Sequence, residues 1–385
     1  MKRIGIITLS GDFNYGNRLQ NFALQKVLKE QNLIVDTINI HNSKKKKYHK
    51  EFLVGYFQGK KDLIYIIKKI SKKLTIQSFI RRRKYNKMII EKQKKIVPFS
   101  NENISSININ RKDLNNLNQK YDLFVAGSDQ IWNPNIIEFE HVNFLSFCPK
   151  EKRYSYAASF GVSNLPETPI NLKNHFKKYL SNMQYISVRE EAGKKIVKDL
   201  LSISVDVAPD PTLLLSQDEW NIMISNKKLV YDKYIIVYFI SNPSKSILDK
   251  IKKFAHDKNL KIIRIMGDEY NKNHCIYTPF EFIQSIRDAE YVFTDSFHGC
   301  VFSIIMNSKF FVFERSDKKG TQSRIIGLLR KFNLENFLIL NEKPELIDVK
   351  FPVNFDGINE KLERERIRGK KLIQNNIINS LIGDS

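Results

Sequence analysis

The sequence predicts an α/β fold of two Rossmann-like domains that face a cleft, followed by a long C-terminal helix. At 385 residues, the chain exceeds the roughly 250–300 at which a single core stops growing. Apolar β-rich runs alternate with segments of helical period, which is typical of a parallel sheet wrapped by helices. The alternation occurs twice. We therefore expect domains over residues 1–220 and 221–357 and the closing helix over 358–385.

Six apolar runs in the first half are expected to form the first sheet. They span residues 3–9, 34–40, 121–126, 153–159, 185–188 and 205–208. Segments of helical period at 18–30 and 171–183 lie between them and are expected to cover the sheet. The stretch 216–232 lacks a clear strand and marks the expected boundary between the domains.

A second series of strands and helices begins at 234–240, a continuous apolar run suited to a central strand buried on both faces. The further expected strands are 261–266, 290–294 and 309–313, and the expected helices are 244–259, 279–289, 297–306 and 323–331. One face of the closing helix carries Leu362, Ile367, Leu372, Ile377 and Leu381. Ligands of open α/β sheets bind beyond the carboxyl ends of the strands, so we expect the chemistry in the loops there.

A basic segment, residues 44–95, interrupts the first expected domain. It holds 19 Lys and Arg residues against three acids, in a chain whose formal net charge is +23. Apolar residues recur within it at helical spacing, with lysines between them, which predicts a basic amphipathic helix. These residues are Leu63, Ile66, Ile67, Ile70 and Leu74. The helix either binds an anionic membrane surface or packs on the protein itself. No nucleic-acid-binding module accompanies it, so we expect no nucleic-acid partner.

The cysteine content and the N-terminus indicate the compartment. Cys148, Cys275 and Cys300 show no metal-ligand or redox spacing, which favours a reducing environment and predicts neither a metal nor another cofactor. The first apolar run is too short for a signal peptide, and no run reaches the roughly 18–20 residues that span a bilayer. We therefore expect a cytoplasmic protein that can lie at the inner face of the membrane through its basic segment.

Polar residues after the first expected strand form one candidate ligand site. Asp12, Asn14 and Asn17 can bind hydroxyl groups, and Arg18 can bind an anion. The alternative is a glycine-permitted turn with an Asn or Asp helix cap. The glycines of this loop do not follow the GxGxxG spacing, so a dinucleotide site is not indicated.

Two further groups of polar residues follow expected strands. Ser128, Asp129 and Trp132 could form a sugar-binding lip in which the indole stacks on the sugar, or Trp132 could be a core residue and Asp129 a helix cap. Arg189 could bind a carboxylate or phosphate bidentately, or pair with a neighbouring acid such as Glu190. A structural role is expected for one more acid, which lies between two prolines. This acid is Asp210.

The strand-to-helix turn at 294–299 is the strongest candidate site. Asp295 and Ser296 supply N-cap chemistry, which places His298 in the first turn of the helix. The helix dipole there favours an anion, and a bound phosphate would help the imidazole hold a proton. Cations expected at the same rim are Lys318, Lys319 and Arg324.

Six motifs taken in order resemble the polysaccharide pyruvyl transferase family. They are GDFNYGNRLQ, DLFVAGSDQIWN, SYAASFG, ISVREEAG, DVAPDPTLLL and TDSFHGCVFSIIMNSKFFVF, and the resemblance covers roughly residues 3–330. It implies a fold similar to that of the B-type glycosyltransferases. It also implies transfer of the enolpyruvyl carbons of phosphoenolpyruvate to two hydroxyls of a sugar, which forms a cyclic pyruvate ketal and releases phosphate.

The resemblance also assigns roles to residues. It implies that Arg189, His298 and either Lys318 or Lys319 contact phosphoenolpyruvate. From the chemistry, His298 is either the acid that protonates the donor or a phosphate ligand, and Ser296 and Arg324 are further candidate donor contacts. The carboxylates that could accept the hydroxyl proton are Asp12, Asp129 and Asp295.

Two departures from the family pattern, Asn17 and the GSDQIW segment, leave the acceptor open. We expect a lipid-linked saccharide of the cell envelope or an exopolysaccharide precursor. One alternative is a nucleotide-sugar-dependent glycosyltransferase of the B-type fold, although such enzymes often carry two glutamates eight positions apart, and Gln322 stands eight positions after Glu314. Another is a non-catalytic protein that binds surfaces through residues 44–95.

Overall fold

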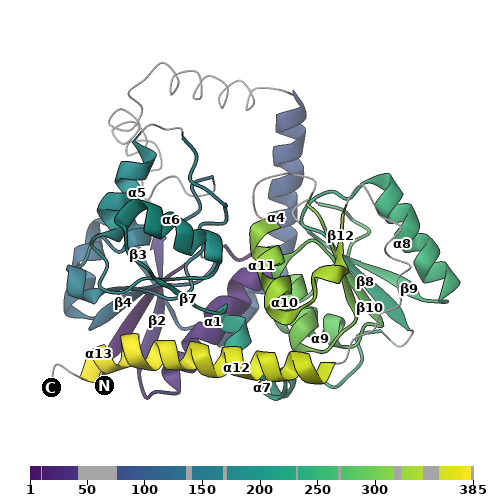
Figure 1. Cartoon of the computed structure of the whole chain (residues 1–385). Coiled ribbons are helices and arrows are strands. Elements are labelled where there is room, and N and C mark those ends of the chain that lie inside the picture. The colour runs from purple at the N-terminus through teal and green to yellow at the C-terminus, as the bar shows by residue number, and fades with distance from the viewer. Residues whose placement is uncertain are drawn as a thin grey trace.

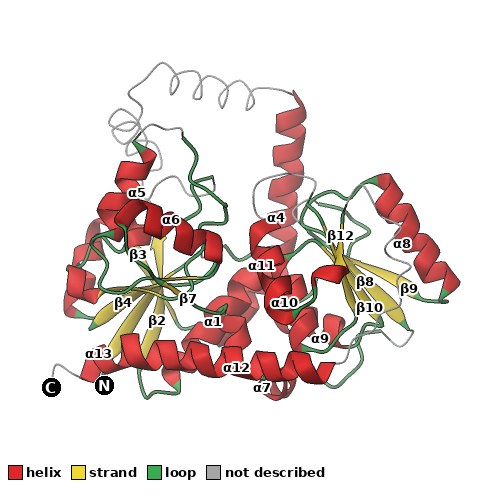
Figure 2. Cartoon of the chain, viewed as in Figure 1, coloured by secondary structure: helices red, strands yellow, loops and turns green. Residues whose placement is uncertain are grey.

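The computed structural model describes residues 1–9, 11–41, 76–135, 141–167, 171–230, 233–267, 270–315, 322–340 and 355–382. Two five-stranded parallel sheets organise these residues, and helices flank both sheets (Figure 1 and Figure 2). The predicted α/β class with parallel sheets is therefore confirmed. The residue limits assigned to the two domains stay a prediction.

The first sheet is built around β1, whose last four residues are buried. Its strands are β1 (Arg3–Ile7), β2 (Ile34–His41), β3 (Ser106–Asn110), β4 (Leu123–Ala126) and β5 (Arg153–Ser155), in the order β3-β2-β1-β4-β5. Two short strands, β6 (Ser187–Val188) and β7 (Asp206–Val207), pair with each other, and single bridges connect β6 and its approach to the chain around β5. The helices and 3-10 turns of this half are α1 (Tyr15–Lys29), α4 (Ile76–Asn103), α5 (Leu172–Leu180), α6 (Glu191–Leu201), η1 (Arg111–Gln119), η2 (His141–Phe144), η3 (Lys150–Lys152) and η4 (Pro211–Leu214).

The second sheet has the order β12-β11-β10-β8-β9, with β8 buried along its whole length as its apolar run predicts. Its strands are β8 (Tyr234–Tyr238), β9 (Lys261–Ile265), β10 (Tyr291–Thr294), β11 (Phe310–Phe313) and β12 (Leu338–Ile339). Side-chain caps from Ser244, Thr278 and Ser296 start three of its helices. The helices and 3-10 turn here are α7 (Gln217–Met223), α8 (Lys245–Asp257), α9 (Pro279–Arg287), α10 (Phe297–Ile305), α11 (Gln322–Phe332) and η5 (Glu335–Phe337).

The sequence patterns predict neither β3 nor α4. Strand β3, with the sequence SININ, alternates exposed and half-buried residues at the sheet edge, so its apolar pattern is too weak to stand out. The predicted basic helix through residues 63–74 lies outside the described residues, and α4 begins just after it. Within the part of the chain that the structure describes, no helix is both long enough and apolar enough to cross a membrane.

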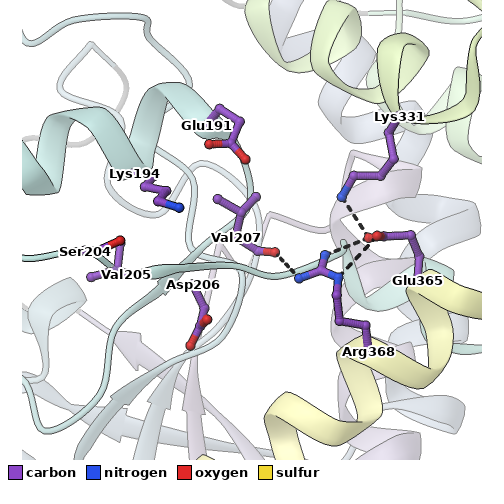
Figure 3. A pocket seen from close by; sticks show the side chains of 9 residues that line it. All are labelled: Glu191, Lys194, Ser204, Val205, Asp206, Val207, Lys331, Glu365 and Arg368. Atoms are coloured by element: carbon purple, nitrogen blue, oxygen red, sulfur yellow. Dashed lines mark hydrogen bonds and ion pairs between the residues drawn. The ribbon is translucent and has the colours of Figure 1, made fainter.

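The predicted long C-terminal helix is confirmed, and it contacts both halves of the chain. Helix α12 (Phe355–Ile373) continues through one π-helical turn (Gln374–Ile378) into α13 (Asn379–Ile382), and it runs along both sheets (Figure 1). Arg368 donates to the carbonyl of Val207 at 2.7 Å and pairs with Glu365. Glu365 also binds Lys331 of α11 at 2.7 Å, beside an opening of about 460 Å³ (Figure 3). The helix therefore fastens β7 to α11.

We expect that Gly369→Ala will lower the free energy of unfolding by about 1–3 kcal/mol because its new methyl group overpacks the contact of α12 with the first half. A Cβ at Gly369 would lie 2.4 Å from Leu214 and 2.6 Å from Pro209. The matched control is Gly327→Ala in α11, where a Cβ meets nothing within 4 Å. The control should raise stability by about 0.5–1 kcal/mol through helix propensity. Denaturant unfolding measures both changes, and an unchanged or raised stability in Gly369→Ala would contradict this packing.

Candidate functional site

A buried polar cluster gathers around the carboxylate of Asp210, in the loop that follows β7. Its Oδ1 accepts hydrogen bonds from the backbone N and the hydroxyl of Thr212, at 3.0 and 2.7 Å. Its Oδ2 accepts from Nη1 of Arg189 at 2.7 Å and from the hydroxyl of Ser128 at 3.2 Å. The same oxygen lies 3.6 Å from Nε2 of His298, in the first turn of the helix that follows β10. One carboxylate therefore joins the carboxyl ends of strands from both sheets.

Asp210 is ionised although it is fully buried. Burial alone would raise the pKa of its carboxyl group, but the adjacent imidazole of His298, followed by the guanidinium of Arg189 and the hydroxyl of Thr212, holds that pKa well below its usual range. An ionised carboxylate at this position attracts positive charge on the imidazole and orients the ring.

Arg189 is the buried cation opposite this carboxylate. It directly follows β6, and its Nη2 lies 3.5 Å from Oδ1 of Asp129 while its Nε lies 4.0 Å from Oε2 of Glu190. Burial lowers the pKa of Arg189, but the charges of Asp210, Asp129 and Glu190 outweigh burial and raise it above its ordinary value. The guanidinium also lies over the ring of Phe297, 4.4 Å from its centroid.

Arg324 brings a second guanidinium to the same ring, 5.8 Å from the Phe297 centroid. With its amide oxygen turned toward α11, Gln130 accepts from Arg324 at 3.0 and 3.3 Å. Burial, followed by the charge of Arg189, lowers the pKa of Arg324 to about 10. Arg324 makes no ion pair with any described residue, and its buried Nε has no hydrogen-bond partner there. Two buried cations this close are electrostatically suited to receive an anion between them.

His298 lies in the first turn of α10, as predicted, below the N-cap of Ser296. Its ring packs against Gly16 at the start of α1, where a Cβ would lie only 2.0 Å from Nδ1. Nε2 has no hydrogen-bond partner among the described residues. The imidazole is thus held near two helix N-termini, which attract anions, with one nitrogen still able to bind a ligand.

A hydrogen-bonded row leads from Arg189 to the loop after β1. Asn17 donates to Oδ2 of Asp129 at 3.4 Å, and Arg18 donates to Oδ1 of Asn17 at 3.0 Å. Arg18 also lies 3.6 Å from Asp12, whose carboxylate accepts from the hydroxyl of Ser100 at 2.7 Å. Asn14 caps α1 by accepting from the backbone N of Asn17, as the alternative interpretation of this loop had it. These contacts bring the expected polar residues of this loop next to the buried cluster.

Two of the expected site residues lie elsewhere. Trp132 is 1% exposed, stacks on Phe144 and donates to a backbone carbonyl, so it is a core residue and offers no face to a sugar. The carboxylate of Asp295 accepts from the backbone N of Ile240 at 2.6 Å and of Ser241 at 2.9 Å, so it ties β10 to the loop after β8. Lys318 and Lys319 lie outside the described residues.

Asp210 and Glu190 are the residues that sequence reasoning missed as parts of the site. Glu190 accepts from the hydroxyl of Ser159 at 2.9 Å and from the backbone N of Phe160 at 2.9 Å. The position of Asp210 in the sequence could have indicated its place in the site. Arg189 and Asp210 follow β6 and β7, which pair in parallel and therefore end at the same edge of their sheet. Among the described residues, no group of three His, Cys, Asp or Glu side chains could hold a metal ion.

Comparison with protein families supports the resemblance found in the motifs. The family model of polysaccharide pyruvyl transferases matches residues 14–317. No curated protein matches the chain.

Solved structures share the fold at low sequence identity. A putative UDP-N-acetylglucosamine 2-epimerase from Listeria monocytogenes superposes with a TM-score of 0.53 at 9% identity, covering 100% of this chain and 98% of its own. MnaA from S. aureus, in a co-structure with UDP, superposes with a TM-score of 0.52 at 11% sequence identity. The match covers 99% of this chain and 97% of the MnaA chain. UDP-GlcNAc 2-epimerase from Methanocaldococcus jannaschii superposes with a TM-score of 0.51 at 12% sequence identity. The match covers 96% of this chain and 98% of the epimerase chain. Structures of this kind have the B-type glycosyltransferase fold, so the predicted fold is confirmed.

We expect that Gly16→Ala will lower kcat at least about 100-fold while leaving the protein folded, because misplacing a reacting group by about 1 Å can cost this much. The new Cβ would overlap the His298 ring, which must move away from Asp210. Steady-state kinetics and circular dichroism measure the two effects, with Gly327→Ala as the control for an added methyl group. Wild-type kcat in folded Gly16→Ala would show that the position of His298 does not matter for turnover.

Proposed function

Because the chain belongs to the polysaccharide pyruvyl transferase family, we propose that it transfers the enolpyruvyl group of phosphoenolpyruvate to a sugar and forms a cyclic pyruvate ketal. One observation carries this proposal. Arg189 and Arg324 converge on the ring of Phe297, next to His298. Phosphoenolpyruvate carries both a carboxylate and a phosphate, and two guanidiniums with a neighbouring imidazole can match both groups.

In the proposed reaction, a proton adds to the methylene carbon of the donor, and positive charge develops at C2. One sugar hydroxyl attacks C2 and the C2–O bond to phosphate breaks, after which a second hydroxyl closes the ketal. The two hydroxyl protons balance the proton taken by the methylene carbon and the one taken by the departing phosphate. His298 supplies the first proton or binds the phosphate. The ionised carboxylate of Asp210, 3.6 Å away, is the positioning group for its imidazole in either role.

The acceptor hydroxyls are proposed to bind beside Asp129 and Asp12. The carboxylate of Asp12 is partly exposed and so can reach a bound sugar, while Asp129 is nearly buried and already pairs with Arg189. Asp295 is the weakest candidate for the base because its carboxylate already accepts from the loop after β8. Lys318 and Lys319 remain proposed donor contacts on the family pattern.

The reaction is tested by incubating the protein with phosphoenolpyruvate and candidate glycans, followed by phosphate assay and NMR. We expect phosphate release together with a new ketal methyl resonance, and about a 10²–10⁴-fold loss of kcat in His298→Ala. If His298 is the acid, KM for phosphoenolpyruvate should stay near the wild-type value, whereas a phosphate ligand should also raise KM. Arg189→Ala should abolish turnover, and its folding must be checked because it leaves Asp210 buried without its cation.

The control variant for this experiment is Gly327→Ala, which should keep full activity. Consumption of a nucleotide sugar without release of phosphate from phosphoenolpyruvate would overturn the pyruvyl transferase proposal. The same result would favour the glycosyltransferase alternative. Of the two glutamates that often mark such glycosyltransferases, the chain has Gln322 in place of the second. The amide oxygen of Gln322 accepts from the backbone N of Arg315 at 3.2 Å.

We further propose that the acceptor is a lipid-linked saccharide of the cell envelope and that the protein binds the anionic inner face of the membrane. The support is the amino-terminal part of α4, where apolar side chains are exposed among cations. The exposed apolar residues are Phe79, Ile80, Tyr85 and Ile90, and the exposed cations are Arg81, Arg82, Arg83, Lys84 and Lys87. Basic and apolar residues together bind anionic bilayer surfaces.

Liposome flotation tests this membrane proposal. Wild-type protein should float with vesicles that contain anionic phosphatidylserine and not with neutral ones. Reversing the charge of Arg81, Arg82 and Arg83 to Glu should abolish flotation, since each basic residue contributes about 1 kcal/mol near such a surface. The control is Ile222→Ser, which removes an exposed apolar residue from α7. Equal flotation with neutral vesicles, or unchanged flotation of the reversed variant, would contradict the proposal.

A further inference from the structure

A cavity of about 420 Å³ lies at the carboxyl ends of β8 and β9, apart from the buried cluster. Its floor is formed by the ends of the two strands and the loop after β8. Side chains from α8, α4 and the segment before α9 complete the wall. The lining includes Phe239, Ile240, Leu248, Arg264, His274 and Lys84. Nothing in the proposed transfer of pyruvate uses this cavity.

The polar side of the cavity is cationic. Arg264 is half-buried, and its guanidinium makes no hydrogen bond or ion pair within the described residues. His274 presents a buried Nδ1 that has no hydrogen-bond partner there, and burial, followed by the charge of Arg264, lowers its pKa. Lys84 adds an ammonium group from α4. None of the described lining residues is a carboxylate. This combination suits a multiply charged anion such as a phosphate group.

The opposite side of the cavity is apolar and closely built. Phe239, Ile240 and Leu248 supply side-chain surface. Gly267 approaches so near the loop that a Cβ would lie 1.8 Å from the carbonyl oxygen of Phe239, which only glycine permits. Pockets with an apolar wall and a few converging polar groups are typical of small-molecule sites. The cavity is large enough for a diphosphate and part of the group that it carries.

The cavity is connected to the buried cluster by the carboxylate of Asp295. Asp295 accepts from the backbone of Ile240 and Ser241, which line the cavity, and it precedes His298 by three residues. Three residues span at most about 10 Å, so a ligand in the cavity lies within the length of a short saccharide of His298. This placement gives Asp295 a structural role between two sites.

We propose that this cavity binds the phosphate or diphosphate through which the acceptor sugar is linked to its carrier, so that the sugar extends toward His298. This inference rests on the proposed pyruvyl transfer, since it assigns the acceptor of that reaction. The chemistry recognised is a glycosyl phosphate or diphosphate, and the carrier is either a nucleoside or a lipid.

Calorimetric titration of the whole protein with inorganic pyrophosphate tests the cavity without any turnover. We expect Arg264→Gln and Lys84→Gln each to weaken pyrophosphate binding at least tenfold while phosphoenolpyruvate binding stays unchanged. Arg324→Gln should do the reverse. The control is Lys253→Gln, which removes an exposed cation of α8 outside the cavity. Unchanged pyrophosphate affinity in both cavity variants, or an equal loss of phosphoenolpyruvate affinity, would overturn the proposal.

Two further titrations identify the carrier. Tighter binding of UDP than of pyrophosphate would assign a nucleoside carrier, tighter binding of geranyl diphosphate a lipid carrier, and equal binding would limit recognition to the diphosphate. Each of these results supports the proposed binding site, provided that Arg264→Gln weakens the binding of the ligand that was titrated. Failure of the proposed function is a separate result, because phosphate would then never be released from phosphoenolpyruvate, whatever the cavity binds.

Discussion

The buried carboxylate of Asp210 is the interaction on which the rest of the site depends. It is paired with Arg189, bonded by Thr212 and Ser128, and placed beside His298, so it contacts loops from both sheets. Removing one partner of such a buried pair typically costs about 3–5 kcal/mol because the other charge is left unmatched. The geometry of the site and the stability of the domain contact are therefore not separable at this residue.

The charges in the buried cluster are unevenly distributed between Arg189 and Arg324. Asp210, Asp129 and Glu190 surround Arg189, whereas the one acceptor that Arg324 meets within the described residues is the amide oxygen of Gln130, and Arg324 shares the ring of Phe297 with Arg189. Positive charge is thus neutralised on the side of the first sheet and left over on the side of α11. An incoming anion would meet this surplus without having to displace a carboxylate.

The fold could be predicted further from the sequence than the site. Apolar runs such as β8 signal their burial directly, whereas the half-polar edge strand β3 does not. His298 was found because a capped strand-to-helix turn is a local pattern. The role of Asp210 was missed because it depends on β6 and β7 pairing across the intervening helix, which no local pattern records. For Trp132 the local pattern was misleading, because an aromatic residue after a strand can pack in the core as readily as it can bind a ligand.

Helix α12 has a consequence for the order in which the protein can assemble. Its contacts with Val207 and Leu214 complete the packing of the first half, yet it is synthesised after the second sheet. The first half of the chain cannot reach its final packing while the ribosome is still making the second half. Until α12 is made, the surface of the first half beside η4 stays exposed to solvent. Contacts this distant in sequence are slow to form. The closing of α12 is therefore a late step shared by both halves, which couples their folding into one event.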